Sequence, residues 1–271
     1  MEWFEAILLG LVQGLTEFLP VSSSGHLAIG RELLGVEASD DLVFEVAVHA
    51  ATVLSTIVVF RKQIWGLLQG LFRFRYNDET DYILKIGISM IPVFVVGVFF
   101  KDFVTGLFGS LSGVAVALLV TAILLLFSDF ASRAYDGAKS VVRTNPYRNG
   151  ISYWQAFVVG LGQAVAVVPG LSRSGTTIAT GLICGVKRDV MAQFSFLMVL
   201  VPILGEAFLD VVGGDMAASS VGMLPLALGF LSAFVSGLFA CKVMIALVKR
   251  AKLYWFAIYC VAVAVAIFIL G

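Results

Sequence analysis

The chain has 271 residues, of which 60% are hydrophobic and 13% are charged, and its mean hydropathy is +1.00. A soluble domain carries about 25% charged residues, so the composition excludes a water-soluble globule and favours a membrane protein. The formal net charge is zero, and the sequence has no basic stripe with interleaved aromatic residues, so we expect no nucleic-acid partner. Three cysteines lie in apolar stretches without metal-ligand spacing, and we interpret them as buried apolar residues: Cys184, Cys241 and Cys260.

The first element expected in chain order is a broken hairpin. Glu2 and Glu5 stand where a signal peptide would carry basic residues, so we expect this segment in the mature protein. Apolar residues run from 2 to 34, and a polar break at 20–25 interrupts them. Each half is shorter than the roughly 20 residues that a spanning helix needs. We therefore predict a re-entrant helical hairpin, whose broken backbone must be satisfied by protein or by a wet cavity.

Spanning helices and a second hairpin follow. Three apolar segments reach spanning length: 42–60, 84–101 and 112–130. Residues 153–186 form a second interrupted stretch, with its polar break at 169–175, and predict a second re-entrant hairpin. Three more spans are expected after it: 190–211, 222–247 and 253–270.

Residues recur along the chain at a nearly constant spacing. A first set is Gly10, Leu11, Gln13, Ser22, Ser24, Gly25 and Phe44, and it recurs 150 positions later as Gly160, Leu161, Gln163, Ser172, Ser174, Gly175 and Phe194. We interpret residues 1–271 as a single membrane domain made of two repeats, 1–131 and 150–271. Each repeat holds one hairpin and three spans. Because three is odd, the second repeat must be inverted, which places a site between the repeats near the midplane.

The basic residues predict the orientation of the chain. One side of the membrane collects Arg61, Lys62, Arg73, Arg75, Lys85, Arg133, Lys139, Arg143, Arg148, Lys187, Arg188, Lys249, Arg250 and Lys252. The other side carries Arg31 and Lys101 together with the acids Asp40, Asp41 and Asp215. Since Lys and Arg favour cytoplasmic loops, we expect both termini outside. The first hairpin then enters from the outside and the second from the cytoplasm.

The first break carries a cluster of reactive side chains. Gln13 and Glu17 lie four residues apart, which places them on one helix face. Pro20 ends that helix. The serines that follow are expected to cap the next helix, whose first turn contains His26: Ser22, Ser23 and Ser24.

The second break predicts an anion site. It reads Pro169-Gly-Leu-Ser172-Arg173-Ser174-Gly-Thr-Thr177. Two helix N-termini would converge at the midplane, and each offers free N–H groups and a partial positive charge. Arg173 adds a guanidinium suited to phosphate. A charge at mid-membrane costs about 2.5–3.5 kcal/mol, so Arg173 needs a partner, and Glu17 and a bound anion are the candidates.

Other polar residues in the apolar segments have two interpretations. Glu45 and His49 share a face of the 42–60 segment, and a functional and a structural role are equally open for them. Gln13 and Gln163 could hold helices together by hydrogen bonds. Glu206 and Asp210 favour a structural role near the outer interface. A hydroxyl or imidazole nucleophile, a carboxylate, a guanidinium and two helix N-termini together suit phosphoryl transfer, and a carboxylate beside phosphate suits Mg²⁺.

These motifs resemble a known family. The run Glu17-Phe-Leu-Pro-Val-Ser-Ser-Ser-Gly-His26, with Gln13 before it, resembles the (E/Q)xxxE signature of bacterial undecaprenyl-pyrophosphate phosphatases. The run from Pro169 to Thr177 resembles their PGxSRSxxT signature. The likeness extends over the whole chain. It implies an inner-membrane hydrolase that removes the terminal phosphate of undecaprenyl pyrophosphate and recycles the peptidoglycan lipid carrier, with bacitracin resistance on overproduction.

The resemblance also implies a site and a cofactor. Glu17, Ser23, His26 and Arg173 would be catalytic, with Mg²⁺ or Ca²⁺ held at Glu17. Substrate-binding residues would be Gln13, Ser22, Ser24, Ser172, Ser174 and Thr177. The pattern admits either glutamate or glutamine at the position of Gln13. Because this chain has the amide there, Gln13 cannot serve as a base. The nucleophile is open among Ser23, His26 and water.

The rival class is a secondary transporter or flippase for an anionic or lipid-phosphate substrate. Inverted repeats and broken helices are typical of transporters. A transporter needs an anion cradle but no nucleophile, so the residues of the two breaks favour the phosphatase. We expect the polyprenyl pyrophosphate and membrane lipids as partners, and the small residues of the last span permit a homodimer: Ala262, Ala264 and Ala266.

Overall fold

The computed structural model describes residues 1–36, 41–100, 111–137, 148–205, 221–250 and 253–270. Within these ranges the regular structure is helical throughout and contains no strand, which confirms the all-α prediction. Several residues used in the sequence arguments lie outside the described ranges: Asp40, Lys101, Lys139, Arg143, Glu206, Asp210, Asp215 and Lys252.

The first part of the chain contains the first predicted hairpin and three longer helices. Its elements are α1 (Trp3–Thr16), α2 (Ser23–Leu34), α3 (Asp41–Val59), α4 (Arg61–Leu71), α5 (Asp78–Phe99) and α7 (Leu111–Gly137). The boundaries have local causes. Gly35 ends α2 with a left-handed backbone (φ +67°), which glycine adopts without strain. Asn77 caps α5, because its side chain accepts a hydrogen bond from Thr80 N.

The second part of the chain contains the second predicted hairpin and further helices. Its elements are η2 (Arg148–Gly150), α8 (Tyr153–Val165), α9 (Arg173–Ile183), α10 (Arg188–Met198), α12 (Met223–Arg250) and α13 (Tyr254–Leu270). Ser152 and Gln155 form a capping box at the start of α8. The structure has breaks at residues 17–22 and 166–172. The predicted breaks, 20–25 and 169–175, overlap them, but the last three residues of each prediction already belong to the first turn of α2 or α9.

Four described helices are long and apolar enough to cross a membrane: Asp78–Phe99, Leu111–Arg133, Arg188–Gly205 and Met223–Val248. Residues Val43–Val59 and Arg61–Leu71 pass the same test only as one pair, bent by 76°. The predicted span at 253–270 is a shorter apolar helix, Tyr254–Ile269. The chain is therefore a polytopic helical membrane protein.

Helix α4 did not follow from the hydropathy pattern. Its sequence, RKQIWGLLQGL, contains two adjacent basic residues and two glycines, so it is far less apolar than the spans. The helix packs on α5 and is strongly amphipathic rather than uniformly apolar. An average of hydropathy over the length of a membrane span does not reveal such a helix.

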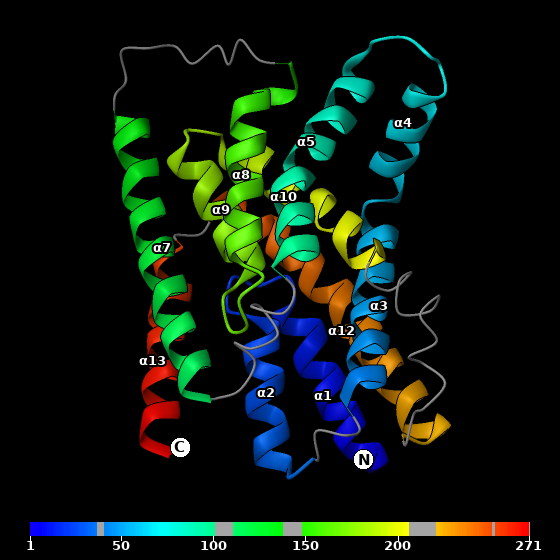
Figure 1. Cartoon of the computed structure of the whole chain (residues 1–271), viewed down its shortest axis with the longest axis vertical. Helices are drawn as coiled ribbons and strands as arrows, with labels where there is room; N and C mark the ends of the chain where they lie inside the picture. Colours follow the sequence, from blue (N-terminus) through cyan, green and yellow to red (C-terminus); the bar gives the residue numbers. More distant parts are fainter. Residues whose placement is uncertain (37–40, 101–110, 138–147, 206–220, 251–252, 271) are drawn as a thin grey trace.

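Two pairs of short helices enter the molecule from opposite ends (Figure 1). Helices α1 and α2 run from the lower end to the middle, whereas α8 and α9 run from the upper end to the middle. The breaks at 17–22 and 166–172 consequently lie near each other at half height. The start of α1 and the end of α13 lie at the same end of the molecule in all three ribbon views.

The first helix of each pair crosses a long helix at very close range. A Cβ on Gly10 of α1 would lie 2.3 Å from the carbonyl oxygen of Gly229 in α12. A Cβ on Gly160 of α8 would lie 2.2 Å from the carbonyl oxygen of Ser89 in α5. Both contacts require glycine, because a side chain would displace the partner helix.

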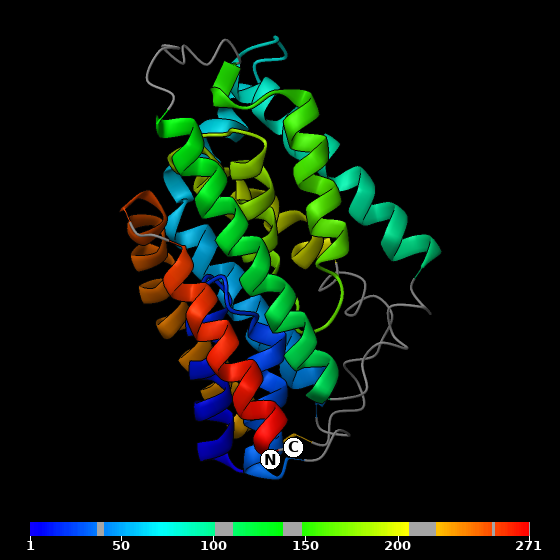
Figure 2. The same ribbon diagram turned by 90° about the vertical axis from the view of Figure 1, so that its left-hand side faces the viewer.

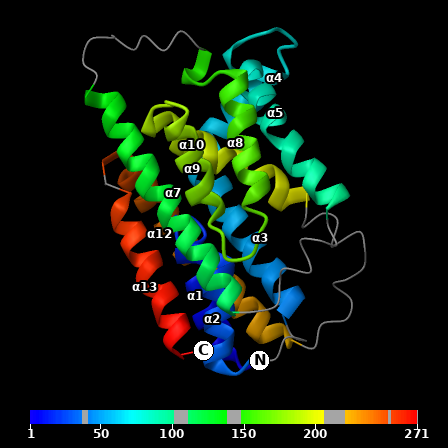
Figure 3. The same ribbon diagram turned by 60° about the vertical axis from the view of Figure 1, so that its left-hand side comes forward.

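Helices α7 and α13 lie side by side and complete the helix bundle (Figures 2 and 3). Ala264 of α13 is fully buried, whereas Ala262 and Ala266 face outward. The small residue at 264 is thus used for packing within this chain. The exposed surface of the other long helices is rich in large apolar side chains, as expected for lipid contact.

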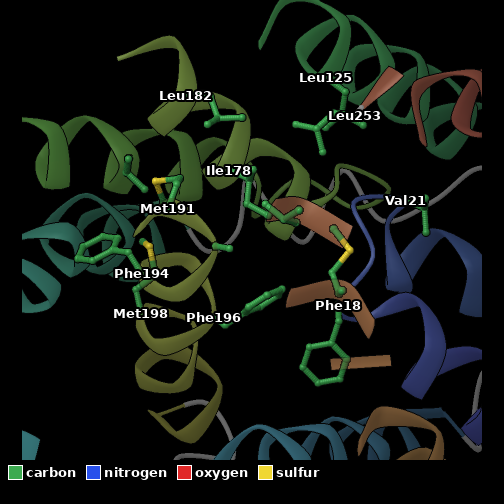
Figure 4. Close-up of a cluster of buried hydrophobic side chains, with 14 of the residues drawn as sticks. Phe18, Val21, Leu125, Ile178, Leu182, Met191, Phe194, Phe196, Met198 and Leu253 are labelled. Atoms are coloured by element: carbon green, nitrogen blue, oxygen red, sulfur yellow. The ribbon is translucent and has the colours of Figure 1, made fainter. Parts of the chain in front are cut away.

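A buried core surrounds the middle of the molecule (Figure 4). Phe18, next to Glu17, meets Phe196 of α10 edge to face with ring centroids 6.0 Å apart. Phe196 in turn lies 6.2 Å from Phe60 at the junction of α3 and α4. This packing holds α10 against the first break.

An ion pair within α5 is joined to the start of α8 by Tyr153 at the basic end. Lys85 Nζ lies 2.5 Å from Asp81 Oδ2, and both side chains are 2% exposed. Asp81 also accepts hydrogen bonds from the hydroxyls of Tyr76 and Tyr153. Because the carboxylate is fully partnered, this buried charge is satisfied and stabilises the junction.

Candidate active site

The first break is shaped by its proline and serines. Helix α1 ends at Thr16, and Pro20 cannot continue a helical hydrogen-bond ladder. Ser22 then caps α2, accepting a hydrogen bond from Gly25 N at 3.2 Å. Its backbone has φ +70°, which is strained for a residue with a side chain. The strain and the cap together define where α2 begins.

The second break is built in a related way. Ser172 caps α9 and accepts a hydrogen bond from Gly175 N at 3.1 Å. Gly170 has φ +83°, and a Cβ there would lie 2.8 Å from Val114 Cα. Only glycine satisfies both requirements, so the break can press directly against α7.

The two breaks touch each other. Ser174 Oγ donates to Leu19 O at 3.0 Å, and Gly170 N donates to Ser24 Oγ at 3.4 Å. A Cβ on Gly175 would lie 3.2 Å from Pro20 Cβ. The N-termini of α2 and α9 therefore meet at the middle of the molecule, where their free N–H groups concentrate positive potential.

Glu17 lies at the centre of this junction. Its Oε1 accepts a hydrogen bond from Arg173 Nη2 at 2.5 Å, across the two breaks. Its Oε2 accepts from Ser23 Oγ at 2.7 Å and from Gln13 Nε2 at 2.9 Å. The Glu17 side chain is only 6% exposed, so these partners provide the stabilisation that water would otherwise supply.

The two histidines occupy different positions. His26 Nδ1 lies 2.7 Å from Ser22 O and therefore donates to that carbonyl. His26 Nε2 then accepts from the Tyr259 hydroxyl at 2.8 Å, and the two rings are stacked. His49 Nε2 instead lies 3.8 Å from Glu17 Oε2. The imidazole beside the central carboxylate is thus that of His49, whereas His26 faces α13.

The Thr177 hydroxyl extends the site toward α10. It donates to Arg173 O at 2.9 Å, and its oxygen lies 2.7 Å from Ser195 Oγ. Ser195 therefore serves as the donor between these two hydroxyls. The contact positions the first turn of α9, which carries Arg173.

A small cavity of about 20 Å³, roughly the room of one water molecule, opens beside the ion pair. Its polar wall consists of Glu17, Thr52, Thr56, Gln163, Arg173, Ser174, Thr177 and Ser195. Its apolar wall consists of Phe18, Val53, Phe196, Val199, Leu200 and Ile203. The cavity lining therefore combines polar groups suited to a charged headgroup with apolar side chains suited to a hydrocarbon chain.

The structure brings together most of the residues singled out in the two breaks. Gln13, Ser23 and Arg173 meet on Glu17, while Ser22 and Ser172 cap the two helices that point at it. Two residues of the site, His49 and Ser195, were not among the predicted site residues. His49 was visible as a polar residue in an apolar span, but its place beside Glu17 depends on tertiary packing.

Glu17 is the group that could hold a divalent cation. No cluster of three or more His, Cys, Asp or Glu side chains occurs within the described ranges. Mg²⁺ is usually bound through one or two carboxylates together with substrate phosphates and water. A carboxylate offers about four acceptor positions, and three are used at Glu17. The residues therefore fit a cation that is completed by the substrate.

Comparisons with known proteins agree along the whole chain. A family model described as bacitracin resistance protein BacA matches residues 6–266. An undecaprenyl-diphosphatase of Bacteroides fragilis is 54% identical over 269 residues, covering 98% of this chain and 97% of the relative. One of Parabacteroides distasonis is 55% identical over 264 residues, covering 96% and 95%. A more distant relative, undecaprenyl-diphosphatase 1 of Shouchella clausii, is 34% identical over 278 residues, covering 99% and 96%.

Proposed function

Because the chain belongs to the bacitracin resistance protein BacA family, we infer that it is an undecaprenyl-diphosphatase. It hydrolyses undecaprenyl diphosphate to undecaprenyl phosphate and phosphate, which returns the lipid carrier of peptidoglycan synthesis. The observation that carries this inference is the Ser23–Glu17–Arg173 cluster, where a hydroxyl, a carboxylate and a guanidinium from both breaks meet beside one cavity. A transporter or flippase would need the cationic cradle but not the Ser23 hydroxyl held on Glu17.

The mechanism begins with binding of the diphosphate. Arg173 donates one N–H to Glu17. Because the Arg173 side chain is 26% exposed, other N–H groups of its guanidinium can donate to a phosphate. The N-termini of α2 and α9 add backbone N–H groups at the same place. Together these groups hold the headgroup and stabilise the charge that develops during transfer.

The Ser23 hydroxyl is the nucleophile in this proposal. Its oxygen attacks the terminal phosphorus, and a phosphorus–oxygen bond forms while the bond to the bridging oxygen breaks. Glu17, 2.7 Å away, accepts the hydroxyl proton, and undecaprenyl phosphate leaves with the bridging oxygen. Water then releases phosphate from Ser23. His26 stays the proton carrier of this proposal, although its ring contacts Ser22 and Tyr259 rather than Glu17.

A divalent cation, Mg²⁺ or Ca²⁺, belongs to the proposal as a cofactor. Glu17 would hold it through its remaining acceptor position, together with phosphate oxygens and water. When bound, the cation neutralises charge on the diphosphate.

We propose two inverted repeats, 1–131 and 150–271, with the hairpins re-entering the bilayer from opposite sides. Helix α1 crosses α12 at Gly10, and α8 crosses α5 at Gly160, 150 positions later. Ser24 accepts from Gly170 N, whereas Ser174, 150 positions later, donates to Leu19 O, so each serine contacts the backbone of the other break. This reciprocity supports a two-fold relation between the halves.

The proposed location is the inner, plasma membrane of a bacterium, with the basic end in the cytoplasm and both termini outside. The connection between α4 and α5 carries the exposed residues Arg73 and Arg75, opposite the end that holds the start of α1 (Figure 1). The cavity then opens outward. The orientation can be tested on intact cells in a chain whose natural cysteines are replaced. A membrane-impermeant thiol reagent should label Leu33→Cys but not Arg75→Cys, and the reverse labelling pattern would show the opposite orientation.

A homodimer stays a prediction that light scattering of the purified protein can measure.

Phosphate release from undecaprenyl diphosphate by the detergent-purified protein tests the function. We expect release with Mg²⁺ and its loss after chelation, because the headgroup charge is then no longer neutralised. Re-addition of Mg²⁺ should restore the rate. A well-folded protein that releases no phosphate under any of these conditions would contradict the phosphatase and redirect the test to anion uptake in liposomes.

A further inference from the structure

Gln163 in α8 carries an unsatisfied amide inside the candidate site. Its side chain is 2% exposed. Neither Nε2 nor Oε1 has a hydrogen-bond partner within the described part of the chain. Gln163 lines the same cavity as Glu17 and Arg173. A buried amide without partners is costly, so a group that enters the cavity is expected to satisfy it.

Two other glutamines show what Gln163 lacks. Gln13 donates to Glu17, four residues later on the same helix. The residue four positions after Gln163 is Val167, which has no polar side-chain atom. Gln155, at the start of α8, uses both amide atoms: Oε1 accepts from Ser152 N and Nε2 donates to Cys184 O, each at 2.9 Å. A structural role is therefore visible for Gln155 and absent from the contacts of Gln163.

The surroundings of Gln163 indicate the chemistry of its missing partner. The cavity wall it shares contains the guanidinium of Arg173 and the hydroxyls of Thr177 and Ser195. The two hydroxyls bond to each other, so the Arg173 guanidinium is the group suited to an anion with several oxygens, and the remaining lining residues are largely hydrocarbon. A neutral amide can donate to such an anion without adding charge to a cavity that already holds the Glu17–Arg173 pair.

We propose that Gln163 is a substrate-binding residue whose Nε2–H donates to a phosphate oxygen of the prenyl diphosphate headgroup. This inference rests on the proposed phosphatase function and deepens it. Gln163 contributes binding rather than proton transfer, because its amide does not titrate. The residue extends the diphosphate subsite from the two breaks onto the face of α8 that lines the cavity.

Kinetics and stability together separate a binding role from a structural one. Gln163→Leu should raise KM for undecaprenyl diphosphate about tenfold, the loss expected for one hydrogen bond to a charged group. Its kcat should change little, and its Tm in detergent should be unchanged or higher, since no hydrogen bond within the protein is lost. Gln163→Glu should raise KM further, because a carboxylate repels the phosphate.

Gln155→Leu is the matched control on the same helix. It should lower Tm, because two hydrogen bonds are lost, and leave KM unchanged. A Gln163→Leu protein with a lower Tm and an unchanged KM would overturn the proposal in favour of an interhelical hydrogen bond.

Binding of farnesyl methylenediphosphonate, which cannot be hydrolysed, distinguishes this inference from the proposed function. Weaker binding by Gln163→Leu should accompany the raised KM. If the unaltered protein binds the diphosphonate through Gln163 but releases no phosphate, the phosphatase fails and the binding role stands. If the protein is an active phosphatase and Gln163→Leu binds the diphosphonate normally, the binding role fails alone.

Discussion

At the scale of single residues, Glu17 shows how a charge is accommodated inside an apolar bundle. Its carboxylate is bonded by Arg173, Ser23 and Gln13, and the ring of His49 lies nearby. Three of these four partners come from segments other than α1, namely α2, α3 and α9. Removing one partner leaves the others facing an uncompensated charge, which is why buried ion pairs are costly to break.

Ser23→Ala should reduce kcat for undecaprenyl diphosphate by at least about a thousandfold, as expected when a nucleophile is removed. The physical reason is that no other hydroxyl is held on Glu17 among the described residues. Phosphate release measured beside Ser128→Ala provides the control, because the Ser128 hydroxyl donates to Leu125 O within α7 and does not contact Glu17. A Ser23→Ala protein that keeps near-full activity would remove Ser23 as the nucleophile.

The chemistry of the two breaks could be predicted from sequence because polar residues are expensive in an apolar segment. A charged side chain at this depth is expected to have a partner of opposite charge, and Arg173 and Glu17 form an ion pair with each other. His49 and Ser195 could not be placed, since one polar residue in an apolar span has no local signal for its neighbours. The open amide of Gln163 likewise became visible only when its contacts were known.

At the scale of elements, proline and glycine signals predicted the breaks, and hydropathy predicted the long helices. Helix α4 was missed because its basic first turn and two glycines lower its hydropathy. The close crossings at Gly10 and Gly160 were not predicted either. Both glycines were recognised as recurring residues, but only tertiary packing shows that a backbone carbonyl faces each of them.

Gly160→Ala should destabilise the protein by about 1–3 kcal/mol, the usual cost of overpacking a core. The new methyl group would meet Ser89 O at 2.2 Å and push α8 away from α5. Thermal unfolding in detergent measures the effect. Gly87→Ala in α5 is the control, since a Cβ there meets nothing within 4 Å. Equal Tm values for the two variants would contradict this close packing.

At the scale of the whole molecule, the site exists only because two distant segments meet. Residues 17–22 and 166–172 lie far apart in sequence, yet their hairpins converge from opposite ends (Figure 1). The expectation of two inverted repeats, each with three spans, predicted this meeting from sequence, and the repeats themselves stay a prediction. The pairing of atoms across it, such as Ser174 with Leu19 O, depended on packing that no local pattern contains.

A double-mutant cycle on Glu17 and Arg173 tests the composite site most directly. Glu17→Gln and Arg173→Lys should each lower kcat/KM for undecaprenyl diphosphate by about a hundredfold or more, as expected for groups that act in the transition state. Because the two residues act as one unit, kcat/KM of the double variant should be no lower than that of the less active single variant. Losses that multiply would show that Glu17 and Arg173 act independently, and would contradict a single active site formed by both breaks.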